Sequence, residues 1–360
     1  MIFTISQSAL ARALQVASKA QAQNATVPIL GGVLLRAADG SLEIQSTDGV
    51  TSVRHIVPAN VEEGGATVLS GKVLANAVKG FPDEAVTFES DGPVTKVSCA
   101  KSRLVLNALD PRDFPEFPEV EPEQSVTLPL AVAQDMVSKV RRATSRDASR
   151  PTLAGVMVDA DGGVVTMAAT DSYRLAVCRA ACEDVRFSAL VDGTTLGEAV
   201  GMASGDVTVG ASESQVTVSF GGTTFVTRRI EGAFPNWGAL LPSESATVVA
   251  VDADGLAAAV RRVSVVAQSN PSVRLSAARA LIGEVELHAA SQDRGESTES
   301  VPADVEGEDV VVFLNHRYLT DGVGNMSGEV TVRLNGPMQP VLLETHDAVD
   351  FTYLLMPVRG

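Results

Sequence analysis

The chain has 360 residues, of which 45% are hydrophobic and 20% are charged, a composition typical of a globular protein with two or three domains. No apolar run reaches the roughly 18–20 residues that span a bilayer, and the N-terminal MIFTISQSAL lacks the features of a signal peptide. The net charge of −16 argues against general adhesion to nucleic acid, because binding to phosphate requires positive charge.

An amphipathic helix is the first predicted element after FTISQS. Its apolar residues have the i, i+3, i+4, i+7 spacing of one helical face. The same face returns 123 residues later and again after another 123, which favours an internal repeat. The twelve apolar positions are Leu10, Ala13, Leu14, Ala17, Ala133, Met136, Val137, Val140, Leu256, Ala259, Val260 and Val263.

Other stretches repeat as well. PILGGVLL at 28–35 has the pattern of PTLAGVMV at 151–158, and Thr47-Asp48 returns as Thr170-Asp171. Each copy also holds a second predicted helix that precedes a strand with Val-Thr. The apolar pairs of these helices are Leu74 and Val78, Leu196 and Val200, and Leu319 and Val323. We therefore predict three domains, at residues 1–124, 125–245 and 246–360.

Short runs rich in Val, Thr, Leu and Ile separate the helices, and they are broken by DG, GG and NG. Such runs are typical of antiparallel strands and hairpins. Each domain is therefore predicted to be an α+β unit in which the order β-α-β-β-β occurs twice. A row of such domains leaves unpaired strands at its ends, and a closed ring of two chains would cover them.

The predicted helices are more basic than the rest of the chain. Six segments, at 8–27, 71–81, 134–150, 193–203, 255–274 and 314–324, hold 13 basic and 4 acidic residues, which leaves a net charge of −25 elsewhere. A ring with its helices inside would present a positive lumen to duplex DNA, through phosphate contacts that read no sequence. The alternative to a DNA-binding lumen is that these basic residues only lie on solvated helix faces. The residues expected to face DNA are Lys72, Lys79, Lys139, Arg141, Arg142, Arg146, Arg150, Arg261, Arg262 and Arg317.

Five stretches in order along the chain carry a family resemblance: PILGGVLL, ATDSYRLAVCRA (169–180), FPNWGALLP (234–242), RYLTDGV (317–323) and YLLMPVR (353–359). Together they resemble the beta subunit of bacterial DNA polymerase III, the sliding clamp. The resemblance implies a DNA clamp fold, in which each chain forms half of a closed ring with helices inside and sheets outside. It also implies a non-catalytic, cytoplasmic processivity subunit without a cofactor, which encircles double-stranded DNA as a head-to-tail homodimer.

The resemblance further implies a pocket for short linear motifs from the DNA polymerase III alpha subunit, the clamp loader and repair polymerases. Aliphatic side chains and methionines suit an adaptable apolar slot, and Arg174 is expected to hold the polar ends of the peptide. The alternative is that LLMP (354–357) is only a buried final strand and that TDSYRL (170–175) is only a strand-edge turn. The pocket residues would be Leu153, Thr170, Ser172, Tyr173, Arg174, Leu175, Pro235, Ala239, Leu240, Met338, Pro340, Leu354, Leu355, Met356, Pro357, Val358 and Arg359.

Ring closure is expected at the edge strand RLVLNALD (103–110), which would pair with the third domain of the other chain. Leu106 and Ala108 would then face Ser264 and Val265.

Some positions depart from the family pattern. Asn24 stands where many clamps have a basic residue, VDGTTLGEAV (191–200) lacks one near its start, and Ala239 replaces an arginine of some members. These departures raise the hypothesis of a divergent second copy of the clamp that tolerates pocket-binding inhibitors.

Two other function classes compete with a clamp. An enzyme is disfavoured, because H-E-x-x-H, P-loop and G-x-S-x-G motifs are absent and His55, His288, His316 and His346 are scattered. A metal site is also disfavoured, and Cys99, Cys178 and Cys182 are expected to be reduced, buried thiols. A repeat-built interaction protein that never meets DNA would have no reason to place basic residues on its helices.

Overall fold

The computed structural model describes residues 1–22, 27–147, 149–267, 272–278 and 280–359. The chain forms two compact units. Unit 1 consists of Met1–Leu130 and Thr194–Arg229, and unit 2 consists of Ala131–Gly193 and Ile230–Gly360. The middle third of the chain therefore contributes to both units.

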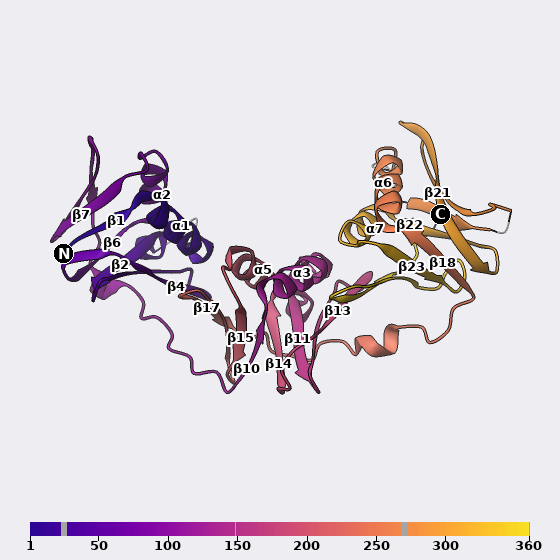
Figure 1. Cartoon of the computed structure of the whole chain (residues 1–360), viewed down its shortest axis with the longest axis horizontal. Helices are drawn as coiled ribbons and strands as arrows, with labels where there is room; N and C mark the ends of the chain where they lie inside the picture. Colours follow the sequence, from indigo (N-terminus) through magenta and orange to yellow (C-terminus); the bar gives the residue numbers. More distant parts are fainter. Residues whose placement is uncertain (23–26, 148, 268–271, 279, 360) are drawn as a thin grey trace. The chain divides into compact units, whose positions relative to one another are not determined.

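The predicted order β-α-β-β-β occurs twice in each third of the chain, which confirms the α+β fold class (Figure 1). The first third adds a short strand, β5, and the second adds a short helix, α4. The first third contains β1 (Ile2–Ser6), α1 (Gln7–Ala17), β2 (Gly32–Ala38), β3 (Ser41–Thr47), β4 (Thr51–Pro58), β5 (Asn60–Glu63), β6 (Gly65–Ser70), α2 (Gly71–Lys79), β7 (Ala85–Asp91), β8 (Val94–Cys99) and β9 (Ser102–Asn107).

The second and third copies follow the same order. The second contains β10 (Gln124–Leu128), α3 (Leu130–Val140), α4 (Pro151–Ala154), β11 (Gly155–Asp161), β12 (Val164–Thr170), β13 (Arg174–Ala181), β14 (Phe187–Asp192), α5 (Gly193–Met202), β15 (Val207–Ala211), β16 (Gln215–Phe220) and β17 (Thr223–Arg228). The third contains β18 (Thr247–Asp252), α6 (Ala253–Ser264), β19 (Ser272–Ala277), β20 (Glu284–Ser291), β21 (Gly295–Gly307), β22 (Val310–Asn315), α7 (His316–Val323), β23 (Glu329–Leu334), β24 (Val341–His346) and β25 (Asp350–Leu355).

Several helices end earlier than the charge pattern suggested. Helix α1 starts after Ser6, whose hydroxyl accepts a hydrogen bond from the Ala9 amide as an N-cap, and it ends at Ala17. Helix α6 ends at Ser264, so Arg274 lies on β19 and not on a helix. The α-helices of the described residues hold seven basic and four acidic side chains, so they have fewer basic residues than predicted but remain net positive.

All twelve residues of the repeated helical face are buried, as are the six of the second helices, so the predicted periodicity is confirmed. In unit 1 helices α1 and α2 lie side by side (Figure 1). Their apolar faces pack on a core that includes Phe3 and Phe88, whose rings stack with centroids 4.6 Å apart. Burial of each large side chain there contributes roughly 1.5–3 kcal/mol relative to exposure.

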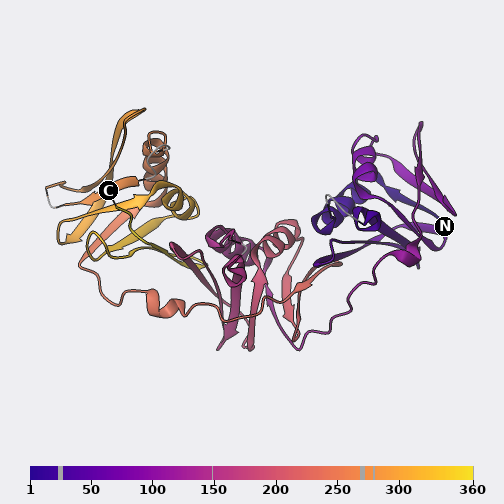
Figure 2. The ribbon, with the colours of Figure 1, turned by 180° about the vertical axis from the view of Figure 1, so that it is seen from behind.

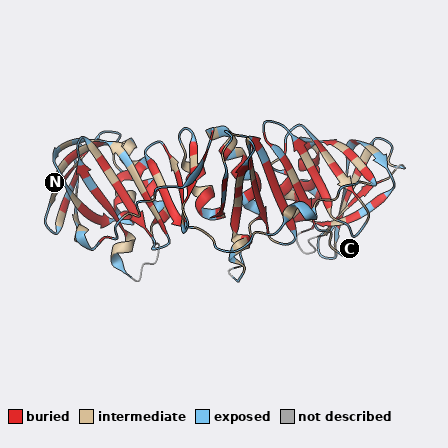
Figure 3. Cartoon of the chain, turned by 90° about the horizontal axis from the view of Figure 1, so that it is seen from below, coloured by how far each residue is buried: buried red, intermediate tan, exposed pale blue. Residues whose placement is uncertain are grey.

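The strands of the described residues form three sheets. Unit 1 holds a five-stranded sheet, β5-β1-β7-β8-β9, and an eight-stranded sheet, β10-β15-β16-β17-β4-β3-β2-β6. Unit 2 holds a twelve-stranded sheet, β14-β11-β12-β13-β25-β24-β23-β18-β21-β20-β19-β22, against which α6 and α7 pack as a pair (Figures 1 and 2). Buried and exposed residues alternate along many of the strands (Figure 3), as expected for sheets with one face on a core.

Two strand pairings join elements of neighbouring repeats. In unit 1, β4 pairs with β17, and we name this pairing the first junction. In unit 2, β13 pairs with β25, with Arg174 opposite Leu355, and we name this pairing the second junction. Strand β13 lies 123 residues after β4 in register, since Thr51 and Arg174 begin the two strands. The two junctions are therefore equivalent places in the repeat.

Candidate functional site

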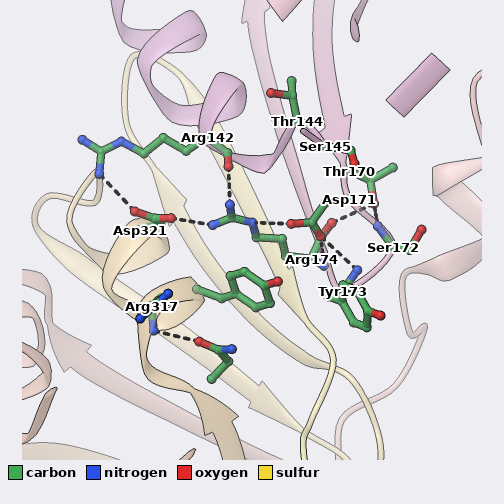
Figure 4. A network of polar contacts seen from close by, with 12 residues as sticks. Arg142, Thr144, Ser145, Thr170, Asp171, Ser172, Tyr173, Arg174, Arg317 and Asp321 are labelled. Carbon is green, nitrogen blue, oxygen red and sulfur yellow. Dashed lines mark hydrogen bonds and ion pairs between the residues drawn. The ribbon is translucent and has the colours of Figure 1, made fainter. Parts of the chain in front are cut away.

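A tight turn, residues 170–174, leads from β12 into β13 at the second junction (Figure 4). The Thr170 hydroxyl donates to the Arg174 carbonyl at 2.7 Å, and Asp171 Oδ1 accepts from the amides of Tyr173 and Arg174, each at 3.0 Å. These bonds fix the turn with Ser172 at a φ of 79°, in the left-handed region that costs a residue other than glycine free energy. The turn projects Tyr173 outward, with 59% of its surface exposed.

Arg174 lies beneath this turn and is only 8% exposed. Its Nε donates to Asp171 Oδ2 at 3.0 Å, and its Nη1 donates to Asp321 Oδ2 at 2.6 Å and to the Tyr353 hydroxyl at 3.3 Å. Its Nη2 donates to the carbonyl of Arg142 (Figure 4). The guanidinium was expected to hold the ends of a peptide, but the structure gives it internal partners on four residues.

Charge and burial act in opposite directions on this cluster. Burial by itself lowers the pKa of Arg174, but Tyr353, Asp321 and Asp171 together raise it above its ordinary value, so the guanidinium remains charged. Burial also raises the pKa of Tyr353, which keeps its hydroxyl neutral and able to donate to the Tyr318 carbonyl at 3.0 Å.

Tyr318 of α7 is a site residue that the sequence analysis did not single out, although it lies within RYLTDGV. The Arg174 guanidinium carbon lies 4.5 Å from the centroid of its ring, in cation–π geometry. The rings of Tyr173 and Tyr318 stack with centroids 6.4 Å apart and an interplanar angle of 21°. Arg174 and α7 therefore hold the exposed Tyr173 ring from below.

An apolar cluster beside the turn forms a floor. Leu175 and Val177 of β13 pack there with Ala168 of β12, Leu342 of β24 and Leu354 of β25. The segment after β17 covers this cluster with Phe234, Trp237 and Leu241, and Arg179 lies 5.2 Å from the Trp237 ring. Two expected pocket residues, Leu175 and Leu354, are thus core residues, 1% and 3% exposed.

The other expected pocket residues divide by exposure. Thr170, Leu153 and Leu355 are buried, whereas Pro340, Pro357 and Val358 are half-buried. The exposed ones are Ser172, Tyr173, Pro235, Ala239, Leu240, Met338, Met356 and Arg359. Two backbone bonds hold the tail in place, from the Met356 amide to the Tyr173 carbonyl at 2.9 Å and from the Val358 amide to the Phe313 carbonyl at 2.8 Å.

Most of the cations expected to face DNA are exposed, and Arg150 is half-buried. Lys139 differs, because it is 5% exposed, pairs with Asp135 Oδ2 at 2.8 Å and lies 5.7 Å from the Phe351 ring. The residue follows Met136 by three positions, which places it on the buried face of α3, so its prediction as a DNA contact is wrong. Arg146 and Arg150 lie in the loop after α3 and not on the helix.

Arg150 instead lies at the turn of the candidate pocket. Its Nε pairs with Asp147 Oδ2 at 2.9 Å, and its Nη1 donates to the Ser172 hydroxyl at 3.1 Å. Arg142 lies in the 3₁₀ turn Arg141–Ala143 and donates to Asp321 Oδ1 at 3.4 Å. The candidate DNA contacts and the candidate pocket therefore share side-chain partners in unit 2.

The expected ring-closing strand is β9, an edge strand of the five-stranded sheet. Leu106 and Ala108 are half-buried against the core of unit 1, whereas Val105, which directly precedes Leu106, points outward and is 63% exposed. In unit 2, Val265 is 61% exposed, and Ser264 donates to the Val260 carbonyl at 2.6 Å. Asn24 lies outside the described residues.

Some remaining expectations concern metal, membrane and thiols. Cys99 and Cys178 are buried, but Cys182 is half-buried because it lies just past the end of β13, so that part of the prediction is wrong. Within the described ranges, no group of three or more His, Cys, Asp and Glu side chains could hold a metal ion. None of the helices in the described parts of the chain has the length and apolar character needed to cross a membrane.

Family models match the chain in three consecutive pieces. Residues 1–118 match the N-terminal domain of the DNA polymerase III beta subunit, residues 127–236 its central domain and residues 239–359 its C-terminal domain. A beta sliding clamp of Streptomyces coelicolor is 33% identical over 100% of this chain and 99% of its own length. The beta sliding clamp homolog GriR of Streptomyces muensis is 32% identical over the same shares.

Solved structures agree with this assignment. The sliding clamp of Bacillus subtilis is 26% identical, has a TM-score of 0.93 and covers 100% of this chain and 99% of its own. A Pseudomonas aeruginosa sliding clamp bound to griselimycin, 23% identical over 100% of both chains, shares the fold with a TM-score of 0.93. The chain therefore belongs to the beta sliding clamp family and is a non-catalytic processivity factor of DNA replication.

Proposed function

We propose that two copies of this chain close head to tail into a ring around duplex DNA, and that a pocket on unit 2 tethers replication and repair proteins to it. The partners are the DNA polymerase III alpha subunit, the clamp loader and repair polymerases, each bound through a short linear motif. The ring acts in the cytoplasm, with domains that meet near residues 124 and 245.

The observation that carries the pocket is an exposed apolar rim above a buried apolar floor. Tyr173, Leu240, Met338 and Met356 are between 40% and 61% exposed, although such side chains favour burial. They lie on segments that meet around the cluster of Leu175 and Leu354. Methionine adapts its shape to different apolar partners, and tyrosine offers a large apolar ring with a polar tip, which suits a pocket that must accept several motifs.

Binding of a labelled peptide tests this pocket directly. We expect a peptide with the C-terminal clamp motif of a polymerase III alpha subunit to bind with micromolar affinity, and Met356→Ala to weaken it at least tenfold, since a few anchors carry most of the affinity. Val164→Ala is the matched control, because Val164 is 42% exposed and Met356 40%. Equal affinity of the two variants would contradict the assignment.

The DNA interface is supported by exposed cations on two helix-side segments. Arg141 and Arg142 follow α3, and Arg261 and Arg262 lie in the last turn of α6. Reversal of all four charges should impair retention on circular DNA while circular dichroism stays unchanged, because phosphate contacts depend on positive charge. Unchanged retention would count against a lumen lined by these residues.

A divergent second copy of the clamp is the second candidate. Two observations favour it: GriR, named a homolog of the clamp, is nearly as similar to this chain as the Streptomyces coelicolor clamp, and Ala239 is exposed at the candidate pocket. Griselimycin, which the Pseudomonas aeruginosa clamp binds, is the probe. Weaker binding than to another clamp of the same cell would support this candidate, and equal binding would end it.

A further inference from the structure

We propose that the Asp321 carboxylate couples the two ligand sites of this clamp, so that duplex DNA held by Arg142 and a partner peptide held beside Tyr173 bind with positive cooperativity. The coupling rests on the proposed function, because it requires that both ligands bind. Its physical basis is one carboxylate that two arginines share, one facing each site (Figure 4).

The two bonds of Asp321 are unequal. Oδ2 accepts from Arg174 Nη1 at 2.6 Å, and the Arg174 side chain is 9% exposed, whereas Oδ1 accepts from Arg142 Nη1 at 3.4 Å and the Arg142 side chain is 50% exposed. A long bond to a solvated guanidinium is weak, and a short charge-assisted bond to a buried guanidinium is strong. Arg142 can therefore leave Asp321 for a phosphate at small cost, whereas Arg174 cannot leave.

Arg174 carries the effect from Asp321 to the pocket. It holds Asp171, which fixes the amide of Tyr173, and it lies against the ring of Tyr318, on which the Tyr173 ring stacks. Its Nη2 also holds the carbonyl of Arg142 itself. A firmer bond between Arg174 and Asp321 therefore orders the turn, helix α7 and the Tyr173 ring together.

The first junction has an equivalent ion pair but no equivalent of Arg174. Lys19 pairs with Glu198 at 3.5 Å, and these residues lie 123 positions before Arg142 and Asp321. The position equivalent to Arg174 is Thr51, which donates to Thr227 and has no charge to share. The helix-side ion pair therefore occurs at both junctions, but only at the second does it reach an exposed aromatic residue.

The sign of the coupling follows from the charges. When a phosphate takes Arg142, Asp321 loses one of its two cations, and its attraction to Arg174 increases because less of its charge is neutralised. The turn that carries Tyr173 is then more ordered before a peptide arrives, which reduces the entropy lost on binding. By thermodynamic linkage, the peptide must strengthen DNA binding by the same factor.

A peptide titration with and without DNA tests this coupling. We would measure the anisotropy of the labelled polymerase alpha peptide with the full chain, alone and with a short blunt duplex at a concentration that saturates each variant. We expect DNA to tighten peptide binding about fivefold in the wild type, at the lower end of measured allosteric couplings. Arg142→Gln should bind the peptide about fivefold more tightly than wild type without DNA, and DNA should add nothing.

Lys19→Gln is the matched control, because it removes the same charge at the equivalent place in the first junction and should keep the fivefold effect of DNA. Two results would overturn the coupling: a peptide affinity that DNA leaves unchanged although both ligands bind, or an equal loss of the effect in Lys19→Gln and Arg142→Gln. A protein that binds neither ligand would instead overturn the proposed function, and the coupling with it.

Discussion

The turns at the two junctions share a backbone conformation but differ in their side chains. In the first, the Thr47 hydroxyl donates to the Thr51 carbonyl at 3.0 Å, and Asp48 Oδ1 accepts from the amides of Val50 and Thr51, each at 2.8 Å. The turn at 170–174 makes the same three bonds, and its third residue, like Gly49, has a positive φ.

The side chains that follow this shared frame decide which junction can serve as a site. At the first junction Thr51 and Thr227 are 8% and 3% exposed and their hydroxyls bond to each other at 3.2 Å, which closes the strand pairing with small groups. At the second, Arg174 pairs with Asp171 of the same turn and with Asp321 of α7, and Tyr173 is left exposed. The Thr-Asp motif is thus a fold signal, and the residues after it make the site.

Removal of Arg174 should give the largest effect, because this side chain is the main difference between the two junctions. Arg174→Ala leaves the buried hydroxyl of Tyr353 and the half-buried carboxylates of Asp171 and Asp321 without their common partner, which should cost about 3 kcal/mol in the free energy of unfolding and abolish peptide binding. Thr51→Ala, its counterpart at the first junction, should cost about 1 kcal/mol and leave peptide binding intact. Urea denaturation and the peptide titration measure both, and equal costs would contradict the difference between the junctions.

Acidification should affect both units through histidines, His55 on β4 of the first junction and His316 at the start of α7 in unit 2. Burial, with Arg317 nearby, lowers the pKa of His316 below its ordinary 6.5, and burial, with Arg12, lowers that of His55. The unfolded chain then binds more protons than the folded one, so stability is full above pH 6.5 and falls as the pH drops below it.

The unsatisfied histidine should account for more of this loss. His55 Nδ1 lies 2.8 Å from the Thr223 hydroxyl, whereas the buried Nε2 of His316 has no hydrogen-bond partner among the described residues. Urea unfolding at pH 7.5 and pH 5.5 should therefore show a smaller loss for His316→Gln than for the wild type. The same loss in both proteins would mean that other groups carry the pH dependence.

Local periodicity predicted the fold well, because the apolar face of each helix is encoded within a few turns. Leu10, Ala133 and Leu256 are buried at equivalent places for this reason. The ends of helices were harder to predict: the basic segment predicted at 255–274 includes Arg274, but this residue belongs to a strand paired with β20 and β22. Helix termini depend on caps and tertiary packing more than on composition.

The candidate site was only partly predictable. The resemblance marked Tyr173 and Met356, but three of the four partners of Arg174 lie 32 to 179 residues away, and no local pattern predicts them. One signal was present and unused. Lys19 and Glu198 lie one repeat before Arg142 and Asp321, so the charge pairs at equivalent spacing could have been read from the sequence alone.

The smallest expected effect concerns the strained third residue of the turn. Ser172 adopts a φ of 79° where the first turn has Gly49 at 90°. Ser172→Gly should relieve backbone strain of about 1 kcal/mol, partly offset by the larger entropy of glycine in the unfolded chain and by the lost bond to Arg150, for a net gain of about 0.5 kcal/mol. Gly49→Ser is the reciprocal change and should destabilise unit 1 by about 1 kcal/mol. Both changes in the free energy of unfolding follow from urea denaturation midpoints, provided that the slope m stays constant.

If Ser172→Gly also leaves peptide affinity unchanged, the serine serves neither stability nor binding of that motif. If it weakens the peptide, the hydroxyl that holds Arg150 at the turn is part of the pocket, and the strain is retained for binding.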